Sequence, residues 1–381
     1  MAKNIRIGIL THNYPKAKGE RKDTGIFIYD FAQKLVKTNK VFVFCPDSVG
    51  EKEDYKNVPV TWFEWGGPDK KFGNWSFFSP LSIYHFFKLI IVGTKKAVAF
   101  AQQNRLDYCL SAWSLPSAIF AYAVKKKLKI RYGVWNLGSD LNKYAKFPIL
   151  RQLIVLSLKN ADNLFANSYD LCGKVEKLTG RKCTFMQSVT NIQTENIEMP
   201  VLDRNLFNFL YVGRLERVKG PDILLVACTI LKKETQKFRV NVLGGGSMYE
   251  FLSKRMCFHS LGDLIKLQGW ADEKKVAGYM KASDCLVIPS RSESLPLVII
   301  EAAKMGLPII ATNVGDCKRL IDKYMAGFCV PKESPIKLAG AMKKAVSEGK
   351  LFREKRRKSL LEMTEGFTEE ESVRILLQAI G

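Results

Sequence analysis

Strand-like and helix-like segments alternate along the whole of this chain of 381 residues. Six apolar runs of strand length, separated by helix-like segments, occupy the first half, and six more follow in the second half. Such alternation predicts parallel sheets that are covered by helices on both faces. Apolar runs such as 285–288 are typical of strands buried on both sides. The sequence therefore predicts an α/β fold of two doubly wound, Rossmann-like domains that face each other across a cleft.

The predicted elements can be given as ranges. Strands are expected at 5–10, 41–45, 58–63, 108–110, 132–135, 164–166, 208–212, 239–243, 264–267, 285–288, 309–312 and 328–330. Helices are expected at 25–37, 116–127, 148–160, 221–233, 272–282, 297–304, 335–348 and 369–380. The polar stretch 193–205, which contains Pro200, is the expected join. We therefore expect an N-terminal domain over 1–198 and a C-terminal domain over 199–365.

Cysteine and histidine usage narrows the class of protein. The nine cysteines are scattered without a Cys-x-x-Cys pair, which favours buried thiols in a reducing cytosol over disulfides or structural zinc. The three histidines share no local spacing, so neither a metal site nor a Ser–His–Asp triad is expected. His12 follows the first strand, and a loop histidine with satisfied hydrogen bonds is the simplest interpretation. No apolar run approaches the roughly 18 residues of a membrane-spanning helix. A cytoplasmic protein is expected.

Positive charge is concentrated in the first half of the chain. The net charge is +23, and residues 1–190 hold 30 Lys and Arg against 14 Asp and Glu. Such an excess indicates an anionic partner, either nucleic acid, an anionic membrane surface or a phosphorylated substrate, or it serves solubility alone. The aromatic stretch 75–87 with Lys88, Lys95 and Lys96 fits a membrane-touching helix, although core packing is the simpler interpretation. We find no nucleic-acid-binding motif and expect no nucleic acid partner.

The first informative segment lies at 211–221. A predicted strand ends at Val212, and Gly213 lets the chain turn. Arg214 and Lys219 follow in the loop before a predicted helix. A cation pair at the carboxyl end of a strand suits a diphosphate, because Arg offers a planar fork and Lys a point charge. A solvated loop would explain the two cations equally well.

Two further segments follow neighbouring strands. Gly244 and Gly246 let a ligand approach the backbone, or they form a simple turn. Glu293 lies in the loop after the strand 285–288, and Glu301 lies eight residues later in the next helix. Backbone amides near that helix's N-terminus favour an anion; they belong to Leu295, Leu297 and Val298. Both carboxylates could simply favour a helix start, but Glu301 stands among apolar residues, where an unpaired charge is costly.

In their order and spacing, these segments resemble the donor-binding domain of glycosyltransferase family four, a retaining family with the GT-B fold. Glu293 and Glu301 match the family's Glu-x7-Glu pair, and Arg214 and Lys219 match its phosphate-binding cations. The resemblance extends more weakly over 24–28, 112–117 and 138–140. It places on the acceptor side of the cleft Gly25, Trp113, Asn136 and Asp140. It also implies that the last helix, within 366–381, returns to the first domain.

The resemblance implies transfer of a hexose-type sugar, with retention, from a nucleotide diphosphate donor. Arg214, Lys219 and the helix amides would stabilise the leaving diphosphate, Glu293 would orient the sugar, and Glu301 would hold the ribose. The full set expected to bind the donor is Gly213, Gly244, Gly246, Ser294, Leu295, Leu297, Val298 and Glu301. Because these cations replace a divalent ion, no metal and no cofactor are expected. A UDP- or GDP-sugar is favoured over an ADP-sugar.

The chain departs from the family pattern at three places. Leu137 stands where many members have a His that contacts the sugar, Thr24-Gly25 replaces a Gly-Gly pair, and Ser294-Leu-Pro replaces Gly-Phe-Gly. These departures leave the sugar open. The basic first half fits a glycan or lipid-phosphate-linked acceptor of cell-envelope polysaccharide synthesis, at the inner face of the cell membrane. A sugar-nucleotide epimerase of the same architecture, a non-catalytic nucleotide-sugar sensor and a basic nucleic-acid-binding protein are the alternatives.

Overall fold

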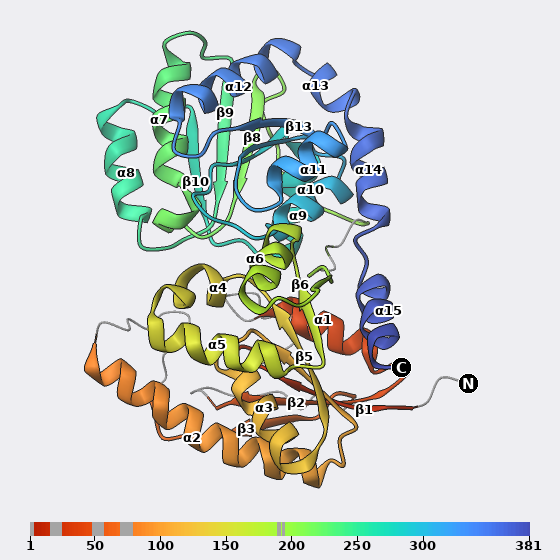
Figure 1. Ribbon diagram of the computed structural model, residues 1–381. Coiled ribbons are helices and arrows are strands. Elements are labelled where there is room, and N and C mark those ends of the chain that lie inside the picture. Colours follow the sequence, from red (N-terminus) through yellow and green to blue (C-terminus); the bar gives the residue numbers. More distant parts are fainter. Residues whose placement is uncertain (1–3, 16–24, 48–56, 69–78, 189–191, 193–194) are drawn as a thin grey trace. The chain divides into compact units, whose positions relative to one another are not determined.

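The computed structural model describes residues 4–15, 25–47, 57–68, 79–188, 192 and 195–381 (Figure 1). The chain divides into two compact units, one formed by residues 1–190 with 369–381 and the other by residues 191–368. Each unit contains one parallel sheet with helices packed against it. The α/β architecture predicted from the alternating sequence is therefore confirmed.

The sheet of the first unit has the strand order β3-β2-β1-β4-β5-β6-β7, and every neighbouring pair is parallel. The strands are β1 (Arg6–Leu10), β2 (Lys40–Pro46), β3 (Val60–Phe63), β4 (Tyr108–Ala112), β5 (Arg131–Asn136), β6 (Asn163–Ala166) and β7 (Thr184–Phe185). The chain winds outward from β1 in both directions. Its switch point, where ligands of doubly wound sheets bind, therefore lies between β1 and β4.

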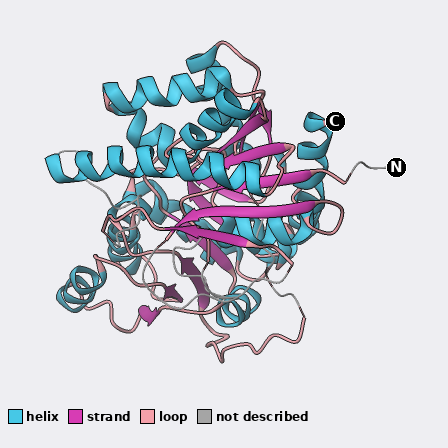
Figure 2. Ribbon diagram, turned by 90° about the horizontal axis from the view of Figure 1, so that it is seen from below, coloured by secondary structure: helices cyan, strands magenta, loops and turns pink. Residues whose placement is uncertain are grey.

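Helices cover both faces of this sheet (Figure 2). One face packs against α2 (Pro80–Gln103), α3 (Ser117–Leu128), α5 (Pro148–Asn160) and α6 (Tyr169–Thr179). The other face packs against α1 (Ile26–Leu35) and α15 (Glu369–Ile380). The short α4 (Ser139–Lys143) and η2 (Tyr144–Lys146) lead from β5 into α5. Of the aromatic stretch 75–87, residues 75–78 lie outside the described residues and the remainder opens α2.

The C-terminal helix α15 completes the core of the first unit. Its buried Val373, Leu376 and Ile380 join the cluster formed by α1 and the strands. The Arg131 guanidinium donates to the Ile380 carbonyl at 2.7 Å, and the Ser372 hydroxyl donates to the Gln187 carbonyl at 3.0 Å. A segment that follows the whole second unit in sequence is thus part of the first.

The sheet of the second unit has the order β10-β9-β8-β11-β12-β13, again parallel throughout. Its strands are β8 (Phe207–Val212), β9 (Phe238–Leu243), β10 (Ile265–Gly269), β11 (Cys285–Ile288), β12 (Ile309–Thr312) and β13 (Gly327–Val330). Its helices are α7 (Pro221–Lys232), α8 (Tyr249–Phe258), α9 (Glu273–Ala282), α10 (Leu297–Lys304), α11 (Cys317–Lys323), α12 (Pro335–Glu348), α13 (Leu351–Glu354) and α14 (Arg357–Glu365). The switch point lies between β8 and β11.

The division between the units differs from the expected boundary. It falls between residues 190 and 191 rather than 198 and 199, and the second unit extends to residue 368. The segment before Pro200 packs on α9, because the Glu198 carbonyl oxygen lies 2.3 Å from the position that a Cβ on Gly278 would take. This close backbone contact attaches the connecting segment to the second unit.

The cysteines are free thiols, and seven of the nine are buried, as expected from their scattered spacing. Within the described ranges, no helix combines the length and the apolar content that crossing a bilayer requires.

Candidate active site

The loop after β8 carries the predicted cation pair. The Tyr211 hydroxyl donates to the Arg214 carbonyl at 2.9 Å, which fixes the start of the loop. Residues Arg217–Lys219 form one turn of 3-10 helix, η3, before α7 begins at Pro221. The Arg214 side chain is exposed and that of Lys219 is half-buried. Both cations therefore lie at the carboxyl end of β8, at the switch point of the second sheet.

Lys219 is brought directly against Glu293, which follows β11 on the other side of the switch point. The Lys219 ammonium donates to Glu293 Oε1 at 2.7 Å, and the Ser290 hydroxyl donates to the same oxygen at 2.8 Å. The Glu293 side chain is 11% exposed. A carboxylate this enclosed is costly unless it is paired and hydrogen-bonded, and these two donors supply both. The pair joins the two loops that flank the switch point.

Arg291 fixes this arrangement, and sequence reasoning missed it. Its guanidinium donates to both carboxylate oxygens of Asp222 at 2.7 and 2.8 Å and to the Arg217 carbonyl at 2.7 Å. It also donates to Glu333 at 3.0 Å, and the Arg291 amide donates to the Val218 carbonyl at 2.8 Å. Burial raises the pKa of Asp222, but the hydrogen bonds and charge of Arg291 outweigh it, so that pKa is lowered overall. Arg291 thereby holds η3, and with it Lys219, against the Glu293 loop.

Two glycines permit the close packing of these loops. Gly220 has φ +66°, and a Cβ there would lie 2.0 Å from the Pro289 carbonyl oxygen. Gly315 has φ +51°, and a Cβ there would lie 2.0 Å from the Ser294 carbonyl oxygen. Only glycine accepts both the left-handed conformation and such an approach. Sequence analysis singled out neither position, because the packing partner of each is far away in sequence.

The N-terminus of α10 follows this loop. Leu295 is buried, and the helix begins at Leu297, so the first amides of α10 have no acceptor within the helix. One face of α10 is buried; it consists of Ile299, Ile300, Ala302 and Ala303. Leu297, Val298 and Glu301 are half-buried. The helix thus turns the apolar sequence neighbours of Glu301 to the core and leaves Glu301 half-buried beside them.

The glycine loop after β9 packs against the loop after β8. A Cβ on Gly244 would lie 1.9 Å from the Gly213 carbonyl oxygen, and one on Gly246 would lie 2.8 Å from the Leu215 carbonyl oxygen. The Glu216 carboxylate accepts from the Ser247 hydroxyl at 2.7 Å and from its amide at 3.1 Å, and these bonds lower the pKa of Glu216. Glycine at positions 244 and 246 is thus needed for the close packing of this loop against the loop that carries Arg214.

In the first unit, Gly25 and Trp113 follow β1 and β4, at the switch point of that sheet. Gly25 precedes α1 with φ +64°, and a Cβ there would lie 2.7 Å from the Asn13 carbonyl oxygen. Trp113 has φ +69°, which is rare for a bulky residue, and its amide donates to the Trp135 carbonyl at 2.9 Å. Its ring centroid lies 4.4 Å from that of His12. Burial lowers the pKa of His12 to about 3, so the imidazole is neutral at physiological pH.

Asn136 ends β5 and is fully buried. Its Oδ1 accepts from the Ser114 hydroxyl at 2.7 Å, and its Nδ2 donates to the Phe165 carbonyl at 2.9 Å. The side chain therefore links the loop after β4 to β6. Asp140 lies in α4, but its side chain, like Thr24, is outside the described residues.

The arrangement in the second unit can bind an anion next to an ionised carboxylate. Arg214, Lys219 and the N-terminal amides of α10 supply positive potential. Glu293 supplies negative charge beside them. Among the described residues, no group of three or more His, Cys, Asp or Glu could hold a metal ion. The two cations and the amides thus form a site suited to an anion.

Comparisons with known proteins bear on the same region. Residues 193–361 match the model of a family described as glycosyl transferases, group 1. Over 240 residues the chain is 27% identical to an uncharacterized 41.2 kDa protein in the cps region of Klebsiella pneumoniae, covering 59% of this chain and 64% of that one. Over 150 residues it is 32% identical to the D-inositol 3-phosphate glycosyltransferase of Frankia alni, covering 37% of each. The chain thus spans less than two thirds of the length of these relatives.

Solved structures resemble nearly the whole chain. The sucrose-phosphate synthase of Thermosynechococcus elongatus aligns with a TM-score of 0.80 and 18% identity over 98% of both chains. Anabaena Alr3699/HepE in complex with UDP aligns with a TM-score of 0.75 and 16% identity over 98% of this chain and 99% of that one. The predicted GT-B fold is therefore confirmed. The family match at residues 193–361 supports a glycosyltransferase family for the second unit.

Proposed function

We propose that this chain is a glycosyltransferase that moves a sugar from a nucleotide diphosphate donor to a glycan or lipid-linked acceptor. The observation that carries the proposal is the Lys219–Glu293 pair at the switch point of the second sheet. Arg214 and the start of α10 are on the neighbouring loops, and all of these residues fall within the matched range 193–361. The resemblance to glycosyltransferase family four supports the same function and adds retention of the anomeric configuration.

The residues of the second unit assist the step in which the nucleoside diphosphate leaves the sugar. Negative charge grows on the leaving phosphate as the bond to the sugar breaks. Arg214, Lys219 and the first amides of α10 stabilise that charge without having to reorganise, because their loops are already fixed. Glu293, which Lys219 contacts, stabilises the positive character that develops on the sugar ring. Glu301 holds the ribose hydroxyls. These cations take the part that a divalent ion plays elsewhere, so no metal is required.

A uridine diphosphate donor is favoured over the other bases. Anabaena Alr3699/HepE, which has a similar fold, is described in complex with UDP and with UDP-glucose. The relative from the cps region of Klebsiella pneumoniae supports an acceptor in cell-surface polysaccharide synthesis. The charge of the first half, with its 30 Lys and Arg against 14 Asp and Glu, supports a cytoplasmic enzyme associated peripherally with the inner membrane face.

The proposal is tested by incubating the chain with a panel of nucleotide sugars and candidate acceptors. We expect release of a nucleoside diphosphate only when an acceptor is present, and an unchanged rate when a chelator is added. Release of an epimerised nucleotide sugar without an acceptor would instead identify an epimerase. A strict dependence on Mg²⁺ or Mn²⁺ would show that Arg214 and Lys219 do not supply the charge that the leaving group needs.

Stereochemistry is tested separately. The anomeric configuration of the first product, followed by NMR during a single turnover, should equal that of the donor sugar. An inverted product would remove the family-four assignment while leaving the transferase proposal intact.

A further inference from the structure

Three neighbouring helices of the first unit contain no acidic residue. In the structure α3 packs against both α2 and α5, and all three cover the same face of the sheet. Their sequences hold eight Lys and Arg and neither Asp nor Glu; the cations are Lys88, Lys95, Lys96, Lys125, Lys126, Lys127, Arg151 and Lys159. By contrast, α15 on the opposite face begins with three glutamates. These three helices thus form a layer that carries cations and no acidic residue of its own.

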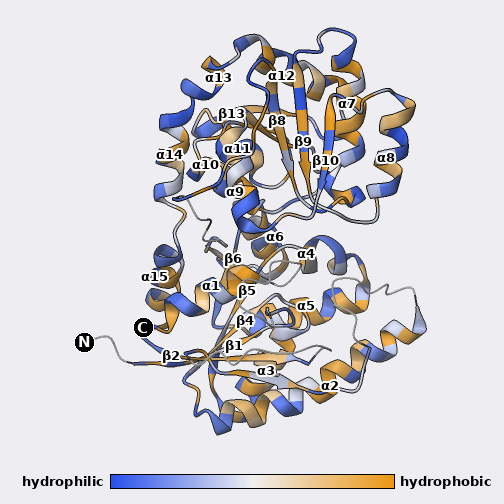
Figure 3. Ribbon diagram, turned by 180° about the vertical axis from the view of Figure 1, so that it is seen from behind, coloured by the Kyte–Doolittle hydropathy of each residue, from blue (hydrophilic) through white to orange (hydrophobic). Residues whose placement is uncertain are grey.

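The outer face of α2 is apolar as well as basic. Its inner stripe of Phe86, Leu89, Gly93, Ala97 and Phe100 is buried in the core. A second stripe faces solvent at helical spacing; it consists of Leu81 (63% exposed), Tyr84 (60%), Phe87 (41%) and Ile91 (57%). Figure 3 shows hydrophobic residues along α2. The outer face of a surface helix is normally polar, so a stripe of this kind marks an interaction site.

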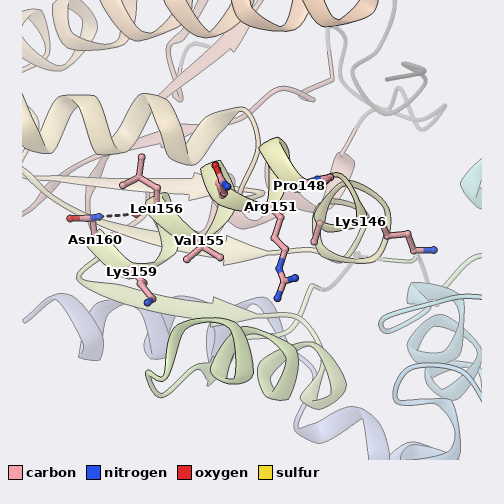
Figure 4. A pocket seen from close by; sticks show the side chains of 9 residues that line it. Lys146, Pro148, Arg151, Val155, Leu156, Lys159 and Asn160 are labelled. Atoms are coloured by element: carbon pink, nitrogen blue, oxygen red, sulfur yellow. Dashed lines mark hydrogen bonds between the residues drawn. The ribbon is translucent and has the colours of Figure 1, made fainter. Parts of the chain in front are cut away.

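Basic and apolar side chains also meet on α5. A surface hollow is lined by Lys146, Arg151 and Lys159 together with Val155 and Leu156 (Figure 4). Residues 151, 155 and 159 are four apart, so they share one face of the helix. In Figure 4, Arg151 and Lys159 point to the same side of α5. Such a hollow can seat a phosphate group between cations with an acyl chain against the aliphatic side chains.

We propose that the α2–α3–α5 layer docks on a bilayer of anionic phospholipid. Tyr84 and Phe87 enter the interface, and the Lys and Arg side chains bind the phosphates of the leaflet. Charge complementarity selects this partner, because a zwitterionic surface would not need the seven cations other than Lys125, which pairs with Asp162 at 2.7 Å. The exposed apolar stripe selects a lipid over a soluble polyanion, which would be bound by charge alone. The inference extends the proposed function by naming the surface that brings the enzyme to a lipid-linked acceptor.

The experiment is co-sedimentation of the full chain with vesicles of phosphatidylcholine alone and of phosphatidylcholine mixed with phosphatidylglycerol. We expect binding to the mixed vesicles only, and its loss at an ionic strength of about 1 M, where the Debye length falls to about 3 Å. Lys95→Glu/Lys96→Glu should weaken binding by about 25-fold or more, since each cation near an anionic leaflet contributes about fivefold. Tyr84→Ser/Phe87→Ser should weaken binding comparably while preserving the circular dichroism spectrum, because both side chains are exposed.

A matched control lies in the second unit, where Ile336 is 70% exposed and Lys337 is also exposed. Ile336→Ser/Lys337→Glu should bind vesicles as the wild type does. Absence of binding, equal binding to phosphatidylcholine alone, or full binding by both α2 variants would overturn the proposal. The proposal would also be overturned if Tyr84→Ser/Phe87→Ser bound vesicles like the wild type while Lys95→Glu/Lys96→Glu bound neither vesicles nor dextran sulfate. Binding by charge alone would then explain both results. Calorimetric binding of UDP in solution, measured on the same proteins, reports on the donor site independently.

Discussion

Lys219 and Glu293 define the chemistry of the second unit at the scale of single residues. The ammonium has three donors and no acceptor, so it can hold Glu293 Oε1 at 2.7 Å and still donate to a phosphate oxygen. The same carboxylate oxygen also accepts from the Ser290 hydroxyl, which fixes its position beside Lys219. In the proposed reaction, this one bond aligns the cation that would bind the leaving group with the carboxylate that would face the sugar.

Glu293→Gln tests whether the Glu293 charge is needed for turnover rather than for binding of the diphosphate. The amide keeps the size of the side chain but removes its charge, so kcat should fall by about a hundredfold or more, as when one preorganised electrostatic group is lost. The Kd for the nucleoside diphosphate should change little, because the amide oxygen can still accept from Lys219. Steady-state kinetics and calorimetry measure the two quantities. Glu234→Gln, which removes an exposed carboxylate paired with Lys343, is the control. Equal losses of binding and turnover would contradict the assignment.

His12 makes the stability of the first unit sensitive to acid. Its pKa is lowered to about 3 by burial, whereas an exposed histidine titrates near 6.5. Between these values the unfolded chain binds the extra proton, so stability rises with pH across this window and is constant above it. We expect the thermal midpoint of the wild type to fall as the pH drops below about 6.5, and that of His12→Asn to fall less. Parallel curves for the two proteins would show that His12 is not the group responsible.

At the scale of elements, the contact between η3 and the loop after β11 depends on Arg291. Asp222→Asn leaves the guanidinium without its bidentate carboxylate and should cost about 1.5–3 kcal/mol, the range for a hydrogen bond to a charged group. Hydrogen exchange of the amides of residues 217–220, 222 and 223 should accelerate, and kcat/KM should fall. Because the pKa of Asp222 is lowered, its contribution is complete above about pH 4 and is lost as the pH falls through the folded value.

The pH dependence of the Asp222 contribution to stability supplies the control for the Asp222→Asn prediction. The difference between wild type and variant in thermal midpoint should be constant from neutral pH to about pH 5 and should shrink below about pH 4. A difference that grows in acid would mean that the Arg291–Asp222 pair is not its origin.

The C-terminal helix α15 gives a second prediction at this scale. Leu376 is fully buried in the cluster that contains Phe31 and Trp135. Leu376→Ala should destabilise the first unit by about 2–5 kcal/mol, although it lies near the end of the chain. Tryptophan fluorescence reports on this unit, because five of the six tryptophans lie in residues 1–190. Leu361→Ala, at a site 42% exposed in α14, should leave the fluorescence transition where it is. An unchanged transition for Leu376→Ala would contradict the placement of α15.

The elements that were predicted best from the sequence are those with a clear pattern of apolar residues. Buried strands such as 285–288 were located to the residue, because parallel strands are apolar throughout. The helix α2 was predicted only as one interpretation of the aromatic stretch 75–87, and its extent to Gln103 was missed, since both of its stripes are apolar. Arg291 and Asp222 were missed because they are 69 residues apart and meet only in the folded chain. Local patterns likewise give no sign that Asn136 is buried with both ends of its amide engaged.

At the scale of the whole molecule, the two units share one sheet topology but differ in the charged residues that they carry. Both sheets wind outward from their first strand, and in each some of the predicted residues follow the two strands at the switch point: Gly25 and Trp113 in the first, Arg214 and Glu293 in the second. The second unit holds Arg214 and Lys219, the cations proposed to bind the diphosphate, while residues 1–190 of the first unit hold +16 of the net charge of +23. The central claim is that the second unit binds a nucleoside diphosphate through Arg214 without a metal ion.

Calorimetric titration of UDP, GDP and ADP, in the presence of a chelator, tests this claim most directly. We expect one diphosphate, UDP in our proposal, to bind the wild type selectively. Arg214→Ala should bind it more weakly by about 1.5–3 kcal/mol, the range for a charged hydrogen bond. Arg255→Ala, which removes an exposed cation from α8, should bind as the wild type does. Absence of binding by all three nucleotides, or equal binding by wild type and Arg214→Ala, would contradict the account.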